Sequence, residues 1–193
     1  MKKLMLVLIL FSQFGFGQKK PVVLIAYFSS QGHTRAMAEA VAKGARSIRN
    51  VDVKLLTVGE ATNDDVLTAD AIIVGSPVHN ANVAVEVQQF INKWPFDGAP
   101  LKDKIGAVFV TAGGISAGEE LAQMNVIHSM LVFGLIIVGG PDWRQPFGAS
   151  AITGEKPFAS PEVKDYVEED FLKKGEALGK RVASVVTQVK RTR

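Results

Sequence analysis

The sequence alternates short apolar runs with segments that carry a helical apolar stripe, and this alternation limits the folds open to the chain. The run at 21–28, PVVLIAYF, is almost continuously apolar, as expected of a strand buried on both faces of a parallel sheet. Residues 34–45, shortly after it, repeat apolar side chains with a helical period. Strands that alternate with helices predict an α/β fold, in which helices cover both faces of a parallel sheet.

The same alternation continues along the rest of the chain. Further strands are expected at 51–58, 69–76, 104–110 and 134–140, and further helices at 83–93, 118–132 and 161–189. Five strands joined by right-handed crossovers fit one doubly wound domain. The one long irregular stretch is expected at 141–160, and long loops in compact domains are often functional.

The first 17 residues are typical of a signal peptide. Two lysines precede an apolar core at 4–11, and two glycines supply small residues before a cleavage point at Gln18. A membrane-spanning helix needs ~20 apolar residues, so this run is too short to span comfortably. A further buried strand or helix is the alternative. We expect a signal peptide at 1–17, a domain at 18–193, and an exported protein, periplasmic or secreted, without a stable membrane anchor after cleavage.

Composition argues against several classes of ligand. The 193 residues include no cysteine, which excludes disulfides and thiol chemistry, and the three histidines are too far apart in sequence to suggest a metal site. The formal net charge is +3, but the basic residues are scattered apart from a short cluster at the C-terminal tail. No aromatic and basic platform for nucleic acid is visible. We therefore expect neither a metal nor a nucleic acid as a partner.

Polar loops follow three of the expected strands: SSQGHT at 29–34, SPVHNAN at 76–82 and TAGGISAGEE at 111–120. In doubly wound sheets, ligands bind beyond the carboxyl ends of the strands, where these loops would meet. The first loop offers three hydroxyls and the backbone N–H groups of a helix start, which suit an anion. An ordinary serine or threonine helix cap would use the same residues, so both interpretations remain open at this point.

Three familiar phosphate-binding arrangements do not fit the first loop. It lacks the lysine of a P-loop, and its single glycine cannot form the GxGxxG dinucleotide motif. A receiver domain would need acidic residues after the first strand and an aspartate after the third, where this chain has serines and a proline. A phosphate bound here would therefore depend on hydroxyls and backbone donors.

Taken in order, the segments AYFSSQGHT, ADAIIVGSPVHNAN, KIGAVFVTAGGISAGEE and PFGASAITG resemble the flavodoxin-like family. More narrowly, they resemble its WrbA-type NAD(P)H:quinone oxidoreductases and NADPH-dependent FMN reductase-like proteins, from Pro21 to about Val186. The resemblance implies a three-layer flavodoxin-like fold with a five-stranded parallel sheet in the order 2-1-3-4-5. It also implies non-covalent FMN, NAD(P)H as a possible donor, a quinone-like acceptor, and a homo-oligomer (dimer or tetramer).

The resemblance places FMN at the three loops. The loop at 29–34 would hold the phosphate, 77–80 would line the ribityl chain and the ring, and 111–116 would wrap the isoalloxazine edge. The expected cofactor-binding residues are Ser29, Ser30, Gln31, Gly32, His33, Thr34, Pro77, Val78, His79, Asn80, Thr111, Ala112, Gly113, Gly114, Ile115 and Ser116. Because the flavin itself carries the redox chemistry, no side chain is assigned a catalytic role.

Three positions bear on substrate choice. Gln31 stands where WrbA-type loops have an aromatic residue, and Phe133 stands where some members have a histidine near the flavin. Trp94 is, by position, a possible counterpart of a family tryptophan that a neighbouring subunit contributes. Two alternatives to the oxidoreductase stay open: an exported one-electron carrier, and a flavodoxin-fold binding module without flavin.

Overall fold

The computed structural model describes residues 19–160 and 162–191, so the expected signal peptide at 1–17 lies outside the described residues. The elements are β1 (Val22–Tyr27), α1 (His33–Arg46), β2 (Asp52–Thr57), α2 (Asn63–Thr68), β3 (Ala71–His79), β4 (Asn82–Val83), α3 (Val85–Ile91), β5 (Ile105–Ala112), α4 (Glu119–Val132), β6 (Ile136–Ile137), β7 (Ala149–Ile152) and α5 (Glu169–Arg191).

The sheet has the predicted strand order. Its main path runs β2-β1-β3-β5-β6, and every neighbouring pair on this path is parallel. In the numbering of the five expected strands, this path is 2-1-3-4-5, so the doubly wound α/β prediction is confirmed. The short β4 turns back antiparallel on β3 and was not expected.

The fifth strand is divided, which the sequence analysis did not predict. The strand expected at 134–140 is reduced to β6, which pairs with Ile105 and Gly106 at the amino end of β5. The chain then leaves the sheet and returns as β7, which pairs with the opposite end of β5. The expectation of an irregular stretch over all of 141–160 is therefore wrong for 149–152. Its sequence, ASAI, lacks the run of large apolar residues that marks a buried strand.

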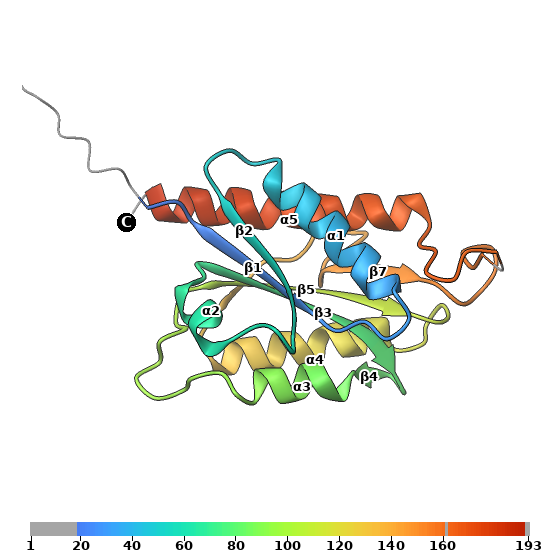
Figure 1. The fold of residues 1–193 in the computed structure, drawn as a ribbon, viewed down its shortest axis with the longest axis horizontal. Coiled ribbons are helices and arrows are strands. Elements are labelled where there is room, and N and C mark those ends of the chain that lie inside the picture. Colours follow the sequence, from blue (N-terminus) through green and yellow to red (C-terminus); the bar gives the residue numbers. More distant parts are fainter. Residues whose placement is uncertain (1–18, 161, 192–193) are drawn as a thin grey trace, which may run out of the picture.

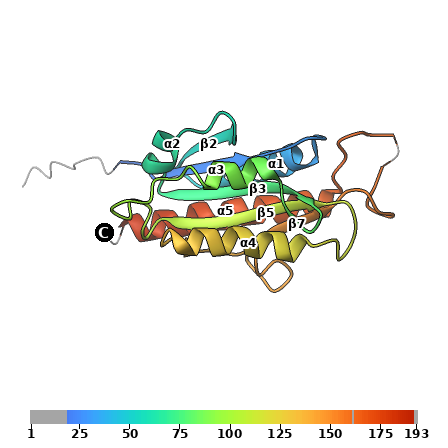
Figure 2. The same cartoon turned by 90° about the horizontal axis from the view of Figure 1, so that it is seen from below.

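Helices cover both faces of the sheet (Figure 1; Figure 2). Helices α1 and α5 lie on one face, and α2, α3 and α4 lie on the other. Side chains of a strand alternate between faces, so Val23 and Ile25 join the core beneath α1 and α5, while Leu24 and Ala26 join the second core. All four are fully buried, which explains the continuous apolar run of β1.

Helices α1 and α5 touch backbone to backbone. A Cβ atom on Gly44 would overlap the carbonyl oxygen of Glu176, and one on Gly179 would overlap the carbonyl oxygen of Val41. Only glycine allows this approach, because any side chain would push the helices apart. The contact fixes the carboxyl-terminal half of α1, the helix that follows the first polar loop.

The segment between β7 and α5 extends beyond the sheet as a long irregular connection (Figure 1, orange). The sequence predicted that the last helix begins at residue 161, but α5 begins at Glu169. Between residues 19 and 191, excluding 161, no helix combines the length and apolar character needed to cross a membrane.

Candidate functional site

The loops after β1, β3 and β5 meet at one edge of the sheet, as the parallel strand order requires. Between them lies a cavity of about 230 Å³, called the loop cavity below. It is lined by Ser30, Gln31, His33, Thr34, Pro77, Val78, His79, Thr111, Ala112, Gly113 and Thr153. All of these except Thr153 were expected from the sequence. Thr153 follows β7, in the stretch where no strand was predicted.

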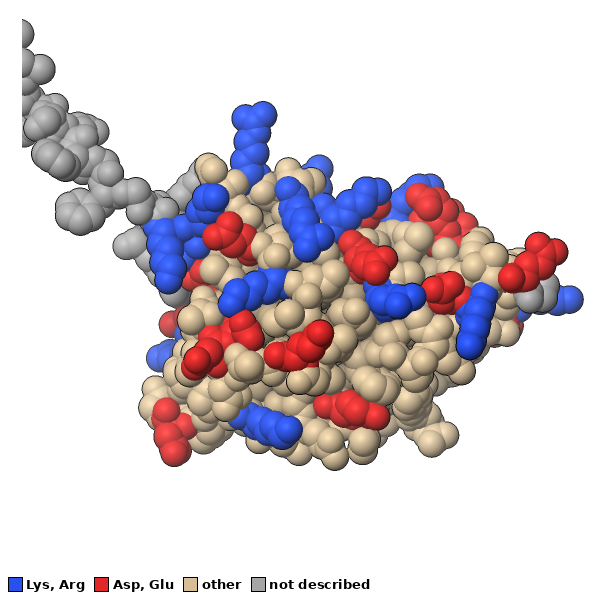
Figure 3. Space-filling model, in the orientation of Figure 1, with Lys and Arg blue, Asp and Glu red and all other residues tan. Residues whose placement is uncertain are grey.

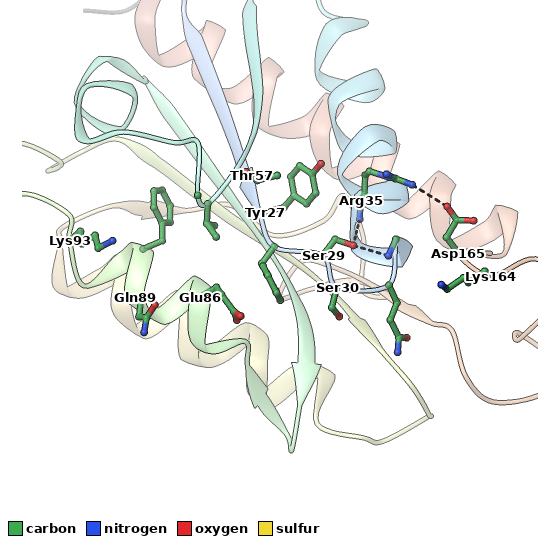
Figure 4. A pocket seen from close by; sticks show the side chains of 16 residues that line it. Tyr27, Ser29, Ser30, Arg35, Thr57, Glu86, Gln89, Lys93, Lys164 and Asp165 are labelled. Atoms are coloured by element: carbon green, nitrogen blue, oxygen red, sulfur yellow. Dashed lines mark hydrogen bonds and ion pairs between the residues drawn. The ribbon is translucent and has the colours of Figure 1, made fainter.

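The first loop enters α1 through a left-handed turn. Gly32 has φ of 100°, which favours glycine. The Ser29 hydroxyl accepts hydrogen bonds from the N–H groups of Gly32 (3.1 Å) and Arg35 (3.2 Å), as Figure 4 shows. Ser29 therefore acts as a local cap. The N–H groups of His33 and Thr34 stand in the first turn of α1, where no acceptor within the helix can reach them.

A hydroxyl pair joins the first and third loops. The Oγ1 atoms of Thr34 and Thr111 lie 2.7 Å apart, and both residues are buried, with exposed fractions of 2% and 4%. One hydroxyl donates to the other, which leaves the accepting hydroxyl with its own proton for a further acceptor. This pair lies in the wall of the loop cavity.

The second loop is a tight hairpin between β3 and β4. Asn80 and Ala81 both have positive φ, 51° and 60°, as in a type I′ turn. The hairpin contacts the third loop, because Gly118 lies so close to Ala81 that a Cβ atom would fall 2.5 Å from the Ala81 Cβ. His79 and Asn80 are exposed, and Asn80 does not line the loop cavity.

Two backbone N–H groups of the third loop donate hydrogen bonds to carboxylates. The N–H of Ile115 donates to Glu155 at 2.7 Å, and the N–H of Ser116 donates to Glu119 at 3.1 Å. The turn at 153–155 is also held by the N–H of Gly154, which donates to the carbonyl of Gly113 at 2.9 Å. Gly114, Ile115 and Ser116 therefore lie outside the wall of the loop cavity. Sequence reasoning missed Glu155, which is 40 residues from its partner.

An ion pair lies against the first loop. The Arg35 guanidinium contacts the Asp165 carboxylate at 3.2 Å (Figure 4). Asp165 also packs closely on Gly32, because a Cβ atom added to Gly32 would fall 2.5 Å from the Cβ atom of Asp165. Burial lowers the pKa of His33, and the nearby Asp165 carboxylate opposes that shift. No sequence motif marked Arg35 or Asp165, since they meet across 130 residues.

A second, larger cavity of about 880 Å³ adjoins the first loop and is called the side cavity below (Figure 4). Ser29, Ser30, Gln31 and Gly32 line it on one side, so the two cavities share Ser30 and Gln31. Its other walls come from the end of β2, from α3 and from residues 164–165. The sequence analysis did not predict it.

Trp94 and Phe133 lie at the other end of the sheet. Their ring centroids are 5.4 Å apart, and Trp94 is 4% exposed. Phe133 lines a surface groove with Lys102, which precedes β5, so both rings are near the amino ends of the strands. Within one chain, Phe133 therefore lies away from the three loops that are expected to hold FMN. Within its own chain the Trp94 ring is buried against Phe90 and Phe133.

No group of three or more His, Asp and Glu side chains that could hold a metal ion occurs between residues 19 and 191, with 161 left out. The polar groups of the loop cavity are hydroxyls, amides, imidazoles and backbone donors. Such groups suit an organic anion that accepts several hydrogen bonds.

Comparison with known proteins agrees with this geometry. The flavodoxin domain family matches residues 24–128, more than half of the chain. A flavodoxin from Aquifex aeolicus is 37% identical over 122 residues, which cover 63% of this chain and 66% of that protein. A protein named NAD(P)H dehydrogenase (quinone) from Geotalea uraniireducens is 31% identical over 209 residues, covering 88% of this chain and 99% of that protein.

Solved structures support the same fold. A WrbA-like flavodoxin from Agrobacterium tumefaciens superposes with a TM-score of 0.69 at 21% identity, over 88% of this chain and 98% of that one. A flavodoxin from the domain Archaea gives a TM-score of 0.64 at 25% identity, over 86% of this chain and 99% of that one. The family match and the near-full-length match to the Geotalea protein confirm the resemblance drawn from the three loops: this chain belongs to the flavodoxin family.

Proposed function

We propose that this chain is an FMN-dependent oxidoreductase that transfers two electrons from a reduced nicotinamide to a quinone. The observation that carries this proposal is the convergence of three donor-rich loops on one cavity. This occurs in a chain that aligns with 99% of a protein named NAD(P)H dehydrogenase (quinone). Hydroxyl and backbone donors at the start of a helix suit a phosphate, and a flavodoxin-family cavity suits a flavin.

The residues of the loop cavity fit FMN. The N–H groups of His33 and Thr34 and the spare hydroxyl proton of the Thr34–Thr111 pair would hold the phosphate. When bound, FMN accepts a hydride and passes the electrons on. Backbone N–H groups of the third loop other than those of Ile115 and Ser116, which already donate to carboxylates, would favour negative charge on the reduced cofactor, because fixed dipoles stabilise charge where it develops. No acid or base side chain is required.

A one-electron carrier is the second candidate, because the Aquifex relative is named flavodoxin. Carriers that dock on protein partners commonly rely on a face dominated by one sign of charge. Lys and Arg are interspersed with Asp and Glu on the face drawn in Figure 3, and the formal net charge is only +3. The mixed charge on this face favours a small-molecule acceptor over a protein docked there.

Anaerobic stopped-flow mixing of the FMN-loaded protein with NADH and with NADPH tests the proposal. Rapid bleaching of the flavin absorbance, followed by reoxidation on addition of a quinone, is expected. Slow bleaching by both nicotinamides, together with a stable semiquinone on chemical reduction, would favour the one-electron carrier. A purified chain that takes up no FMN would leave the flavin-free binding module as the function.

We also propose that the protein is exported after removal of residues 1–17. The basic start, the short apolar core and the glycines before Gln18 support this. Reduced nicotinamide is a cytosolic metabolite, so an exported protein would be separated from its main supply. Identification of the electron donor is therefore the most informative experiment. The homo-oligomer implied by the family remains a prediction, which size-exclusion chromatography with light scattering would test.

A further inference from the structure

We infer that the side cavity binds the adenylate half of the electron donor, and that its charges select a 2′-phosphorylated dinucleotide. This inference rests on the proposed function, because it assigns a place to the donor of that reaction. Its volume of about 880 Å³ lies within the range of roughly 300–1,000 Å³ that is typical of small-molecule sites.

The position of the side cavity suits a ligand that must also reach the loop cavity. The two cavities share Ser30 and Gln31, so a molecule can lie in one and extend past these residues into the other. A dinucleotide has this extended form, with one ring at each end and a pyrophosphate between the two riboses. Its reactive ring would lie on the side of the loop cavity, and its adenosine would lie in the side cavity.

The floor of the side cavity suits a flat ring. Phe28 and Val58 are partly exposed apolar residues that line it, together with the buried Phe90, which is only 5% exposed. The Phe90 ring packs edge-on against Trp94 in the core, with centroids 5.7 Å apart, so it supports the exposed apolar lining from below. Aromatic rings pack well against such a surface.

One face of α3 turns polar groups toward this floor. Glu86 and Gln89 of α3 are exposed and line the side cavity, as does Lys93, two residues beyond the end of the helix, while Val87 and Ile91 point into the core. The carboxylate of Glu86 accepts hydrogen bonds, and the amide of Gln89 both donates and accepts. These groups match the hydroxyls of a ribose and the edge of a purine.

Cations stand at both ends of the side cavity. In Figure 4, Lys93 lies at the end away from the first loop, and Arg35 and Lys164 lie at the end beside it. Arg35 is paired with Asp165, but no ion pair to Lys93 or Lys164 occurs among the described residues. Unpaired ammonium groups that face a cavity favour anionic groups of a ligand.

The order of groups along a dinucleotide indicates which of its phosphates each of these cations would bind. The pyrophosphate lies nearer the reactive ring, so it falls beside the first loop, on the side of the cavity that Lys164 lines. The adenosine then lies over Phe28 and Val58, and a phosphate on its ribose falls on the side that Lys93 lines. Lys93 would thus distinguish NADPH from NADH, because only NADPH carries the 2′-phosphate.

Adenosine 2′,5′-bisphosphate, which lacks the nicotinamide, tests this assignment. Its binding to the FMN-loaded protein and to the variants Lys93→Ala and Lys93→Arg would be measured by isothermal titration calorimetry. Loss of a charge-assisted hydrogen bond predicts a roughly tenfold or greater loss of affinity for Lys93→Ala, with substantial recovery in Lys93→Arg. Lys180→Ala is the matched control, since Lys180 is an exposed lysine of α5 that lines neither cavity.

Kinetics with both donors adds a second readout. Lys93→Ala should raise KM for NADPH about tenfold and KM for NADH much less, whereas Lys180→Ala should leave both KM values, both kcat values and FMN affinity unchanged. Equal affinity of wild type and Lys93→Ala for the bisphosphate would overturn the inference. A fall in FMN affinity would also overturn it, because the side cavity would then belong to the flavin. If the protein takes up no FMN, the proposed function fails, while bisphosphate binding to the same protein still decides this inference.

Discussion

The hydroxyls of Thr34 and Thr111 lie 2.7 Å apart although 77 residues separate them in sequence. Thr34 stands in the first turn of α1, and Thr111 lies near the carboxyl end of β5. The bond therefore joins the loop expected to hold a phosphate to the loop expected to wrap a ring. A side chain in either position that cannot donate would disturb both loops.

Replacement of Thr34 tests the phosphate site. Thr34→Ala removes a hydroxyl that would donate directly or orient Thr111, and hydrogen bonds to charged acceptors contribute ~1.5–3 kcal/mol. We expect a roughly ten- to hundredfold loss of FMN affinity, measured by flavin fluorescence quenching. Thr34→Ser should retain most of the affinity, and Thr68→Ala, on the exposed end of α2, should have no effect. Unchanged FMN affinity in a Ser29→Ala/Thr34→Ala double variant would exclude the assignment.

Asp165 should weaken FMN binding in the wild-type protein. Its carboxylate lies against Gly32 and would face an incoming phosphate of the same sign. We expect Asp165→Asn to bind FMN severalfold more tightly at low salt, with a smaller gain at high salt because exposed charges are screened. Asp170→Asn, an exposed α5 variant, is the control. Weaker binding by Asp165→Asn would instead show that the ion pair with Arg35 shapes the loop for the cofactor.

Glu155 should lower the reduction potential of the bound flavin. Its carboxylate lies on the N–H of Ile115, in the loop that is expected to favour negative charge on the reduced cofactor. Glu155→Gln removes that opposing charge and should raise the two-electron potential by about 20 mV for ~1 kcal/mol of relieved repulsion. Spectroelectrochemical titration measures the shift, with Glu168→Gln as the control. A potential that stays constant in Glu155→Gln would place the carboxylate too far from the ring to act on it.

Acid sensitivity should depend in part on Asp65. Hydrogen bonds from the side chains of Lys54 and Thr62 and from the Thr62 N–H lower its pKa from 3.8 to about 2. Because the folded-state pKa lies below the ordinary value, the contribution to stability is complete above about pH 4. It is lost as the pH falls from there through about 2. Asp65→Asn should therefore lower Tm at neutral pH and reduce the loss of Tm between pH 5 and pH 3, measured by thermal unfolding. Asp64→Asn serves as the neighbouring control.

Export is tested on the protein from its native host. Amino-terminal sequencing should give a first residue near Gln18, with the protein recovered outside the cytosol. Intact Met1 on cytosolic protein would contradict export, and it would make reduced nicotinamide an ordinary donor.

The strand order and most of the loop cavity could be predicted because their signals are local. Strand β1 is buried on both faces and is therefore continuously apolar, and its following loop is contiguous in sequence. The short helix α2 was missed although Thr62 and Asp65 form a capping box, because only Val66 of that helix is buried. Strand β7 was missed because its small residues carry no apolar signal.

The remaining parts of the site depend on contacts between distant segments. Glu155 contacts the third loop and Asp165 contacts the first loop, both from the irregular connection between β7 and α5. No local sequence pattern predicts which part of the protein such a connection will contact. The side cavity exists because the end of β2, the first loop and one face of α3 leave a space between them. Polar residues such as Gln89 and Lys93 resemble any solvated helix face in sequence.

The glycine contact between α1 and α5 has a consequence for how the protein acquires its cofactor. Gly44 meets Glu176, so the helix that begins at the first loop is supported by the last helix of the chain. A growing polypeptide lacks that support until synthesis of α5 is complete. We therefore expect capture of FMN to follow completion of α5. Gly44→Ala or Gly179→Ala would delay that event by separating the two helices, even though neither residue lines either cavity.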